Sequence, residues 1–228
     1  MGSDDLFKKR KARKLRDISR KKRTRELYKR VLIVCEGQKT EPLYFSSLRE
    51  EYRLQATDIR ITNAKGSDPM SLVKYAIDLY KNSQKEGNDF DFVFCVFDKD
   101  DHANYKQAIN EISKIKNKAE FHAITSVPCF EFWLLLHFCC KAKPFRSVKG
   151  KSAAEQVVCE LQNYIPRYKK GDKNTFELTK SNLNQAIKHA KIVNNEAKKV
   201  GTDNPSAMVV DLVETLISLS PLNKESSS

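Results

Sequence analysis

Short apolar runs alternate with amphipathic segments along the first 140 residues, and this alternation limits the possible folds more than any other feature. The runs at 30–35 and 90–97 are rich in β-branched and aromatic residues, as buried strands are. Weaker strand patterns occur at 58–62 and 121–125. Apolar residues at helical spacing fill the intervals between the strands, at 40–48, 71–83 and 104–118. This order predicts an α/β fold with a mainly parallel sheet flanked by helices on both faces.

Two signals indicate where helices begin. Thr40 can cap the helix that follows the first strand, and Pro42 suits its first turn. Residues 65–69 read as a turn that ends in a helix start. Both signals fall between predicted strands, which supports the alternating order.

The pattern changes after about residue 140. Residues 141–151 are basic and turn-like, no strong strand signal follows, and helices are predicted at 152–163, 179–200 and 205–219. A chain of 228 residues can hold one sizeable core with a small appendage. We therefore predict a basic N-terminal arm, flexible or helical, over 1–29, an α/β domain over 30–140, and a helical extension packed on the sheet over 141–222.

The positive charge is concentrated at the N-terminus. Residues 1–30 hold fourteen Lys and Arg against four Asp and Glu, which accounts for ten of the thirteen net positive charges. An arm of this kind attracts a phosphate backbone in a salt-sensitive way. The alternative is a solvated leader, and association with ribosomes or a membrane surface would use the same charge.

Composition also indicates a compartment. No apolar stretch reaches the roughly 18 residues of a spanning helix, and no signal-peptide core follows the basic start. The six cysteines form no Cys-x-x-Cys pair, and they and the four histidines lack zinc-ligand spacing. We therefore expect a cytoplasmic protein with reduced thiols and no membrane association.

Carboxylates follow the two strongest strand runs. Glu36 comes after the first run, and Asp98 and Asp100 come after the second. The carboxyl ends of parallel strands are where open α/β sheets keep their chemistry, and residues two apart on extended backbone point the same way. Clustered carboxylates repel one another unless a cation neutralises them, so the set predicts Mg²⁺ or Mn²⁺ ligands if the two strands are neighbours. Gly37 permits a sharp turn and the close approach of a phosphate.

A metal held by these carboxylates could orient a phosphodiester and activate water. Glu36 could serve as a metal ligand or as a general acid/base. An Asp-Lys-Asp-Asp stretch can also be only a solvated turn.

Three further residues could join this site. Glu131 lies in the apolar segment 129–139, where burying a carboxylate is costly without a partner. It is either a further catalytic carboxylate, binding metal or positioning water, or a helix-start acid that meets backbone amides. His137 is a base or phosphate donor, or a hydrogen-bonded core histidine. His102 is a substrate-binding residue, or an ordinary helix-start residue.

Lysines near these segments are candidates for binding the substrate. Lys39 follows Glu36 closely and could meet a phosphate, with a surface lysine as the alternative. Lys169 and Lys170, next to Tyr168, could add contacts, with a solvated charge cluster as the alternative.

Three sequence blocks carry a resemblance to a known family. VCEGQKTEPLYF at 34–45, FDKDDH at 97–102 and SVPCFEFWLLLHF at 126–138 are together similar to the RloB-like family, over roughly residues 30–220. A strand with Glu-Gly followed by a strand with Asp-x-Asp also resembles the TOPRIM domain of primases, topoisomerases and OLD-type nucleases. Two positions depart from the family pattern, Val127 where Asn is usual and Ala207 where Thr is common.

The resemblance implies a TOPRIM-like sheet and a Mg²⁺-dependent nuclease. The family is associated with restriction-modification and phage-defence loci. The expected substrate is DNA or RNA, tRNA included, and a protein partner from a defence locus and homo-oligomerisation are compatible with this reading. The alternative is a non-catalytic nucleic-acid-binding or regulatory module. Phosphoryl transfer of the primase or topoisomerase kind is less favoured, because the chain is short and no tyrosine can be assigned as a nucleophile.

Overall fold

A computed structural model describes residues 11, 13, 29–61, 68–99, 103–148 and 150–222, with the side chains of 58–61 left out. The predicted arm over 1–29 lies almost wholly outside these residues, as do Asp100 and His102. The described strands are β1 Val31–Cys35, β2 Thr57–Ile61, β3 Phe92–Asp98, β4 Glu120–Val127 and β5 Ser206–Ala207. They form one sheet in the order β2-β1-β3-β4-β5.

The first four strands run parallel. β1 pairs with both β2 and β3, and β3 pairs with β4. The predicted α/β fold with a mainly parallel sheet is confirmed, and it is consistent with the TOPRIM-like sheet that the resemblance implies. β1 and β3 are neighbours, as a shared site at their carboxyl ends requires.

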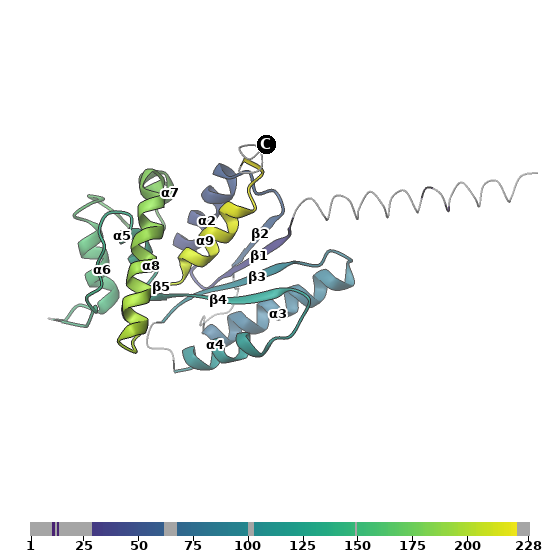
Figure 1. Cartoon of the computed structure of the whole chain (residues 1–228), viewed down its shortest axis with the longest axis horizontal. Helices are drawn as coiled ribbons and strands as arrows, with labels where there is room; N and C mark the ends of the chain where they lie inside the picture. The colour runs from purple at the N-terminus through teal and green to yellow at the C-terminus, as the bar shows by residue number, and fades with distance from the viewer. Residues whose placement is uncertain are drawn as a thin grey trace, which may run out of the picture.

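Helices cover both faces of the sheet (Figure 1). α2 Thr40–Glu51 and α9 Val209–Ser218 lie on one face, and α3 Pro69–Lys85 and α4 Tyr105–Lys114 lie on the other. Side chains alternate in direction along each strand, so the two faces of the sheet contribute to two separate cores. Ile33 and Cys35 point into the core with α2 and α9, whereas Leu32 and Val34 point into the core with α3 and α4.

The remaining helices lie beyond the carboxyl ends of the parallel strands, at the left of Figure 1. They are α5 Glu131–Leu135, α6 Ala153–Leu161, α7 Thr175–Thr179, the 3₁₀ turn η1 Lys180–Asn182 and α8 Leu183–Lys199. Phe132 and Trp133 of α5 are fully buried in the same core as β1. The helical region therefore shares one hydrophobic core with the sheet.

β5 corrects the predicted helix over 205–219. Ser206 pairs antiparallel with Val127, and the amide of Ala207 donates to Asn194 Oδ1 over 2.9 Å. The amide of Met208 donates to the carbonyl of Thr125 over 2.8 Å, and α9 begins only at Val209. These partners come from distant segments, so local apolar spacing did not reveal the strand.

The two helix-start signals have different outcomes. Asp68 caps α3 and accepts from the amides of Met70 and Ser71, at 2.9 and 3.2 Å. The predicted cap of α2 is wrong. Lys39 occupies the N-cap position and Thr40 is the first helical residue, and the Thr40 hydroxyl oxygen accepts from the distant amide of Gly171 over 3.0 Å.

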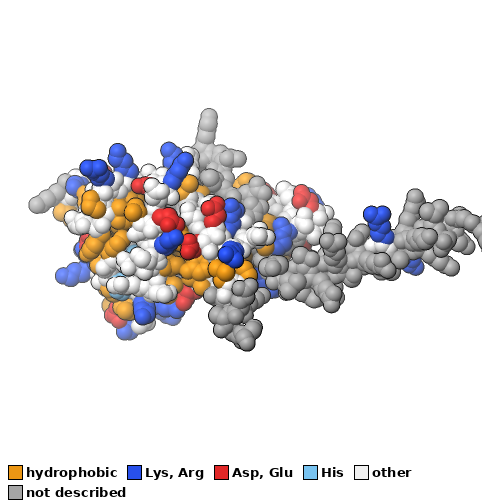
Figure 2. Space-filling model, turned by 90° about the horizontal axis from the view of Figure 1, so that it is seen from above, with side chains coloured by type: hydrophobic (Ala, Val, Ile, Leu, Met, Phe, Trp, Pro, Cys, Tyr) orange, Lys and Arg blue, Asp and Glu red, His pale blue; other side chains and the backbone are white. Residues whose placement is uncertain are grey.

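Charges of both signs are spread over the described surface. On the side where α2 and α9 cover the sheet, acidic and basic side chains lie among apolar ones (Figure 2). In the described part of the chain, no helix is both long enough and apolar enough to cross a bilayer.

Candidate active site

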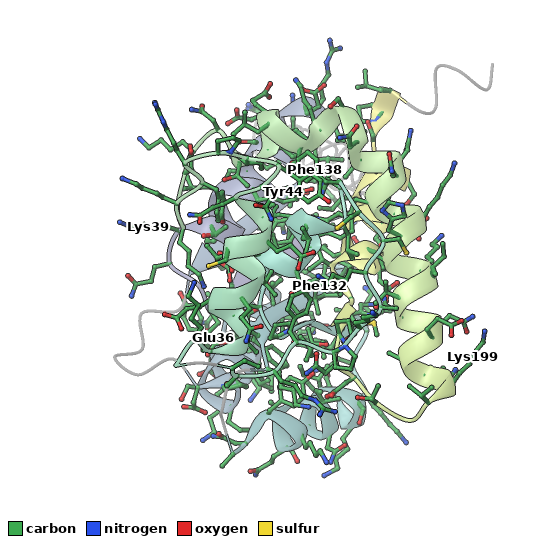
Figure 3. The ribbon with its side chains drawn as sticks, turned by 90° about the vertical axis from the view of Figure 1, so that its left-hand side faces the viewer. Glu36, Lys39, Tyr44, Phe132, Phe138 and Lys199 are labelled. Atoms are coloured by element: carbon green, nitrogen blue, oxygen red, sulfur yellow. The ribbon has the colours of Figure 1, made fainter. Side chains whose placement is uncertain are left out.

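Glu36 and Asp98 lie at the carboxyl ends of two adjacent parallel strands. Cys35 is in register with Val96, and the amide of Glu36 donates to the carbonyl of Val96 over 2.9 Å. Asp98 is the last residue of β3, where the sequence pattern placed it just past the strand. Figure 3 views the molecule from this end and shows Glu36 at the edge of the sheet. The two carboxylates therefore belong to the same edge of the sheet.

Asp98 also acts on groups from outside the strands. Burial, followed by the negative charges of Glu131 and Asp98, raises the pKa of the Cys129 thiol. The thiol therefore stays protonated at neutral pH and is a poor nucleophile or metal ligand. Cys129 comes two residues after β4, and Asp98 is in register with Ser126 of β4, so the segment after β4 also lies at this edge.

Glu131 is a buried acid with partners on both of its oxygens. Its side chain is 2% exposed, and Lys170 Nζ lies 3.2 Å from Oε2. The Tyr168 hydroxyl donates to Oε1 over 3.2 Å. Burial and the nearby Glu131 carboxylate raise the pKa of Tyr168, so its phenol keeps the proton that it donates. Glu131 is therefore suited to holding Lys170 and Tyr168 in place.

Lys170 supplies a positive charge next to Glu131. Partial burial lowers its pKa, but Glu131, Cys129 and Asp98 raise it more, so the net shift is upward. The side chain remains 57% exposed. The ammonium group thus keeps its charge at neutral pH, pairs with Glu131 and is still open to solvent.

The loop that carries Lys170 docks on the start of α2. The amide of Gly171 donates to Thr40 Oγ1, and Gly171 adopts a left-handed conformation with φ +80°. A Cβ added at Gly171 would lie 2.9 Å from Cβ and Cδ of Lys39, so the stem of Lys39 packs against this glycine. Lys39 and Lys169 are both exposed. The structure therefore brings three of the predicted substrate-binding lysines to one junction.

A family comparison covers these elements. A family described as RloB-like protein matches residues 31–216, which include all four parallel strands and most of α9. The chain belongs to the RloB-like family. No curated protein matches it.

Sequence reasoning missed one acid next to the candidate site. A Cβ added at Gly37 would overlap the carboxylate of Glu41, so this carboxylate lies directly against the Gly37 backbone. Glu41 is only 8% exposed, and it raises the pKa of Cys35 in addition to the larger effect of burial. Gly37 thus allows a close approach, and in this structure the approaching group is the carboxylate of Glu41. The spacing Glu-Gly-x-x-Thr-Glu was the available signal.

His137 lies in the aromatic core of the RloB-like chain. It is fully buried, its ring packs 5.0 Å from that of Trp133, and Nδ1 lies 3.1 Å from the Trp133 carbonyl oxygen. Burial lowers its pKa to about 4, so it is neutral at physiological pH. This position matches the alternative of a hydrogen-bonded core histidine.

The donor set suits a hard cation. No group of three His, Cys, Asp or Glu side chains that could hold a metal occurs within the described ranges, which omit Asp100 and His102. Mg²⁺ is commonly bound through one or two carboxylates, with water and substrate phosphates as its other ligands. Glu36 and Asp98 fit that requirement, since both are oxygen donors on adjacent strand ends.

Proposed function

We propose that this RloB-like protein is a metal-dependent nuclease that hydrolyses phosphodiester bonds in DNA or RNA, tRNA included. The observation that carries the proposal is the position of Glu36 and Asp98 at the ends of two adjacent parallel strands, with an exposed lysine, Lys170, paired to Glu131 on the helix after the neighbouring strand β4. Acids alone would repel a phosphodiester. An acidic edge with an ammonium group at its side can bind one once a cation is present.

Each residue has a distinct role in this proposal. Glu36 and Asp98 hold Mg²⁺ or Mn²⁺, and Asp100 is the third ligand expected from the sequence. The bound metal would neutralise phosphate charge and lower the pKa of an attacking water. Lys170 donates to a non-bridging phosphate oxygen and so orients the scissile group. Glu131 and Tyr168 position Lys170, since Glu131 forms an ion pair with Lys170 and accepts a hydrogen bond from the Tyr168 hydroxyl.

The biological setting is a further part of the proposal. We propose a role in anti-phage defence with a partner from the same locus, on the basis of the resemblance to a family that is associated with restriction-modification and phage-defence loci. The competing function is a module that binds nucleic acid without cutting it. The two differ in turnover, because a binding module retains its ligand intact in the presence of metal.

The test uses the purified full chain with Mg²⁺ or Mn²⁺ on single-stranded DNA, duplex DNA and tRNA. We expect Glu36→Gln and Asp98→Asn to reduce cleavage by about 10²–10³-fold or more, since each removes a charge that the transition state needs. Glu50→Gln is the matched control, because Glu50 is an exposed acid of α2. Thermal unfolding checks that each variant folds.

Cleavage at the wild-type rate by either folded variant would contradict the assigned roles. Tight binding by the wild type, with no cleavage of any of the three substrates, would favour the binding module.

A further inference from the structure

The segment 168–171 is a rigid loop that presents cations. Three contacts from separate elements hold it. The Tyr168 hydroxyl donates to Glu131, the Tyr168 carbonyl accepts from Gln162 Nε2 over 3.1 Å, and the Gly171 amide donates to Thr40. Backbone and anchor side chain are thus held, while Lys169 and Lys170 remain accessible to solvent. A preorganised loop of this kind loses little conformational entropy when it binds an anion.

Three lysines lie where this loop meets the start of α2. Lys39 packs its stem on Gly171, and Lys169 and Lys170 immediately precede that glycine. Asp172, the next acid along the chain, accepts from the amide of Asn174 over 2.9 Å. Lys170 Nζ lies 3.2 Å from Oε2 of Glu131, at the start of the helix that follows β4. The junction therefore joins a cluster of three lysines to the acidic edge.

We infer that the 168–171 loop and Lys39 form a phosphate-binding subsite that makes the substrate a polynucleotide strand rather than a mononucleotide. The inference rests on the proposed function. Lys170, which Glu131 holds, contacts the scissile phosphate. Lys39 and Lys169 contact phosphates next to it along the same strand. A mononucleotide offers a single phosphate group and leaves the outer two lysines unused.

Thr40 and Gly171 are the positioning residues of this subsite. The Thr40 hydroxyl holds the loop through the Gly171 amide, and Gly171 is needed for its left-handed φ and for the close packing of Lys39. Thr40 is only 6% exposed, so it acts through the loop and does not touch the substrate.

The experiment measures binding without cleavage. The full chain in EDTA is titrated with a short labelled single-stranded oligonucleotide, in DNA and RNA arms, over a salt series. Lys39→Ala, Lys169→Ala and Lys170→Ala should each lower the salt slope by about 0.7, and weaken binding about five-fold near 0.1 M salt, as loss of one phosphate contact does. Lys106→Ala, at an exposed lysine of α4, is the matched control and should bind as the wild type does.

Two substitutions of Thr40 test its positioning role. Thr40→Ser keeps the acceptor for Gly171 and should bind normally, whereas Thr40→Val removes it and should weaken oligonucleotide binding, at an unfolding temperature close to that of Thr40→Ser. Equal binding by these two variants would overturn the role of Thr40.

Two outcomes would overturn the subsite itself. One is an unchanged affinity and salt slope in all three lysine variants. The other is competition by a nucleoside monophosphate as strong as that by the oligonucleotide. Neither depends on turnover, so a failure here is distinguishable from a failure of the proposed function, which would appear as cleavage retained in Glu36→Gln.

Discussion

The two faces of the sheet differ in what they bury. The core under α3 and α4 is built from apolar side chains and tyrosines such as Leu72, Val73 and Tyr80. The other core lies under α2, α9 and the helices beyond the carboxyl ends of the strands. Three ionisable side chains are buried on this side, those of Glu41, Glu131 and His137. Burying such groups costs free energy unless partners are present. The difference indicates that one face is mainly scaffold and that the other supports the site.

The first prediction tests the scaffold face. Leu72→Ala should lower the free energy of unfolding by about 2–5 kcal/mol, because it removes a fully buried side chain and leaves a cavity. Denaturant unfolding measures this loss. Activity per folded molecule should not change, because Leu72 belongs to the core on the far side of the sheet from Glu131. A large change in cleavage at equal folded fraction would remove the distinction between the faces.

The second prediction uses the buried histidine of the other face. The pKa of His137 in the folded protein is about 4, below the ordinary value of 6.5. The unfolded state therefore binds the proton more tightly, and stability is lost as the pH falls from 6.5 towards 4. A shift of this size corresponds to about 3 kcal/mol. Denaturant unfolding at several pH values measures the slope.

His137→Gln should flatten this slope between pH 6.5 and 4 relative to the wild type. His122→Gln, at a half-exposed histidine on β4, is the matched control for removing an imidazole. If both variants keep the wild-type slope, the acid sensitivity comes from other groups.

The third prediction separates positioning from metal binding. Glu131→Gln keeps the shape of the side chain and an acceptor for Tyr168 but loses the ion pair with Lys170. We expect a stability loss of about 1 kcal/mol, because Lys170 is half-exposed and screened by solvent. Oligonucleotide affinity and cleavage should both fall, while Mg²⁺ affinity measured by calorimetry without substrate should stay near that of the wild type.

A large loss of Mg²⁺ affinity in Glu131→Gln would show instead that Glu131 is a metal ligand. Glu160→Gln is the matched control, since Glu160 also pairs with a lysine, Lys141, in the helical region beyond the parallel strands. It should leave binding and cleavage unchanged.

Much of the fold followed from local patterns. The four parallel strands, the two helices α3 and α4, and the cap at Asp68 all depend on residues close in sequence. The errors arose where a distant partner decided the local structure. β5 exists because β4 and Asn194 bind its backbone, and the Thr40 hydroxyl accepts from the distant amide of Gly171 instead of from an amide of its own helix.

The candidate site also has residues that local sequence predicts and contacts that it does not. Glu36 and Asp98 could be predicted, because acids that follow parallel strands share one edge of a sheet. The contact of Glu41 with Gly37 and the pairing of Glu131 with Lys170 could not, since a sequence does not state which side chains fill a given space. His137 was open between two roles until its burial was known.

The sequence by itself determined the alternating α/β order, the acids at two strand ends and the family to which the chain belongs. These features depend on hydrophobic periodicity and on short motifs, which neighbouring residues carry. Only the tertiary structure decided that Glu131 holds Lys170 and that Gly171 brings its loop to the start of α2. Those contacts join residues far apart in the chain, and the packing of one shared core brings them together.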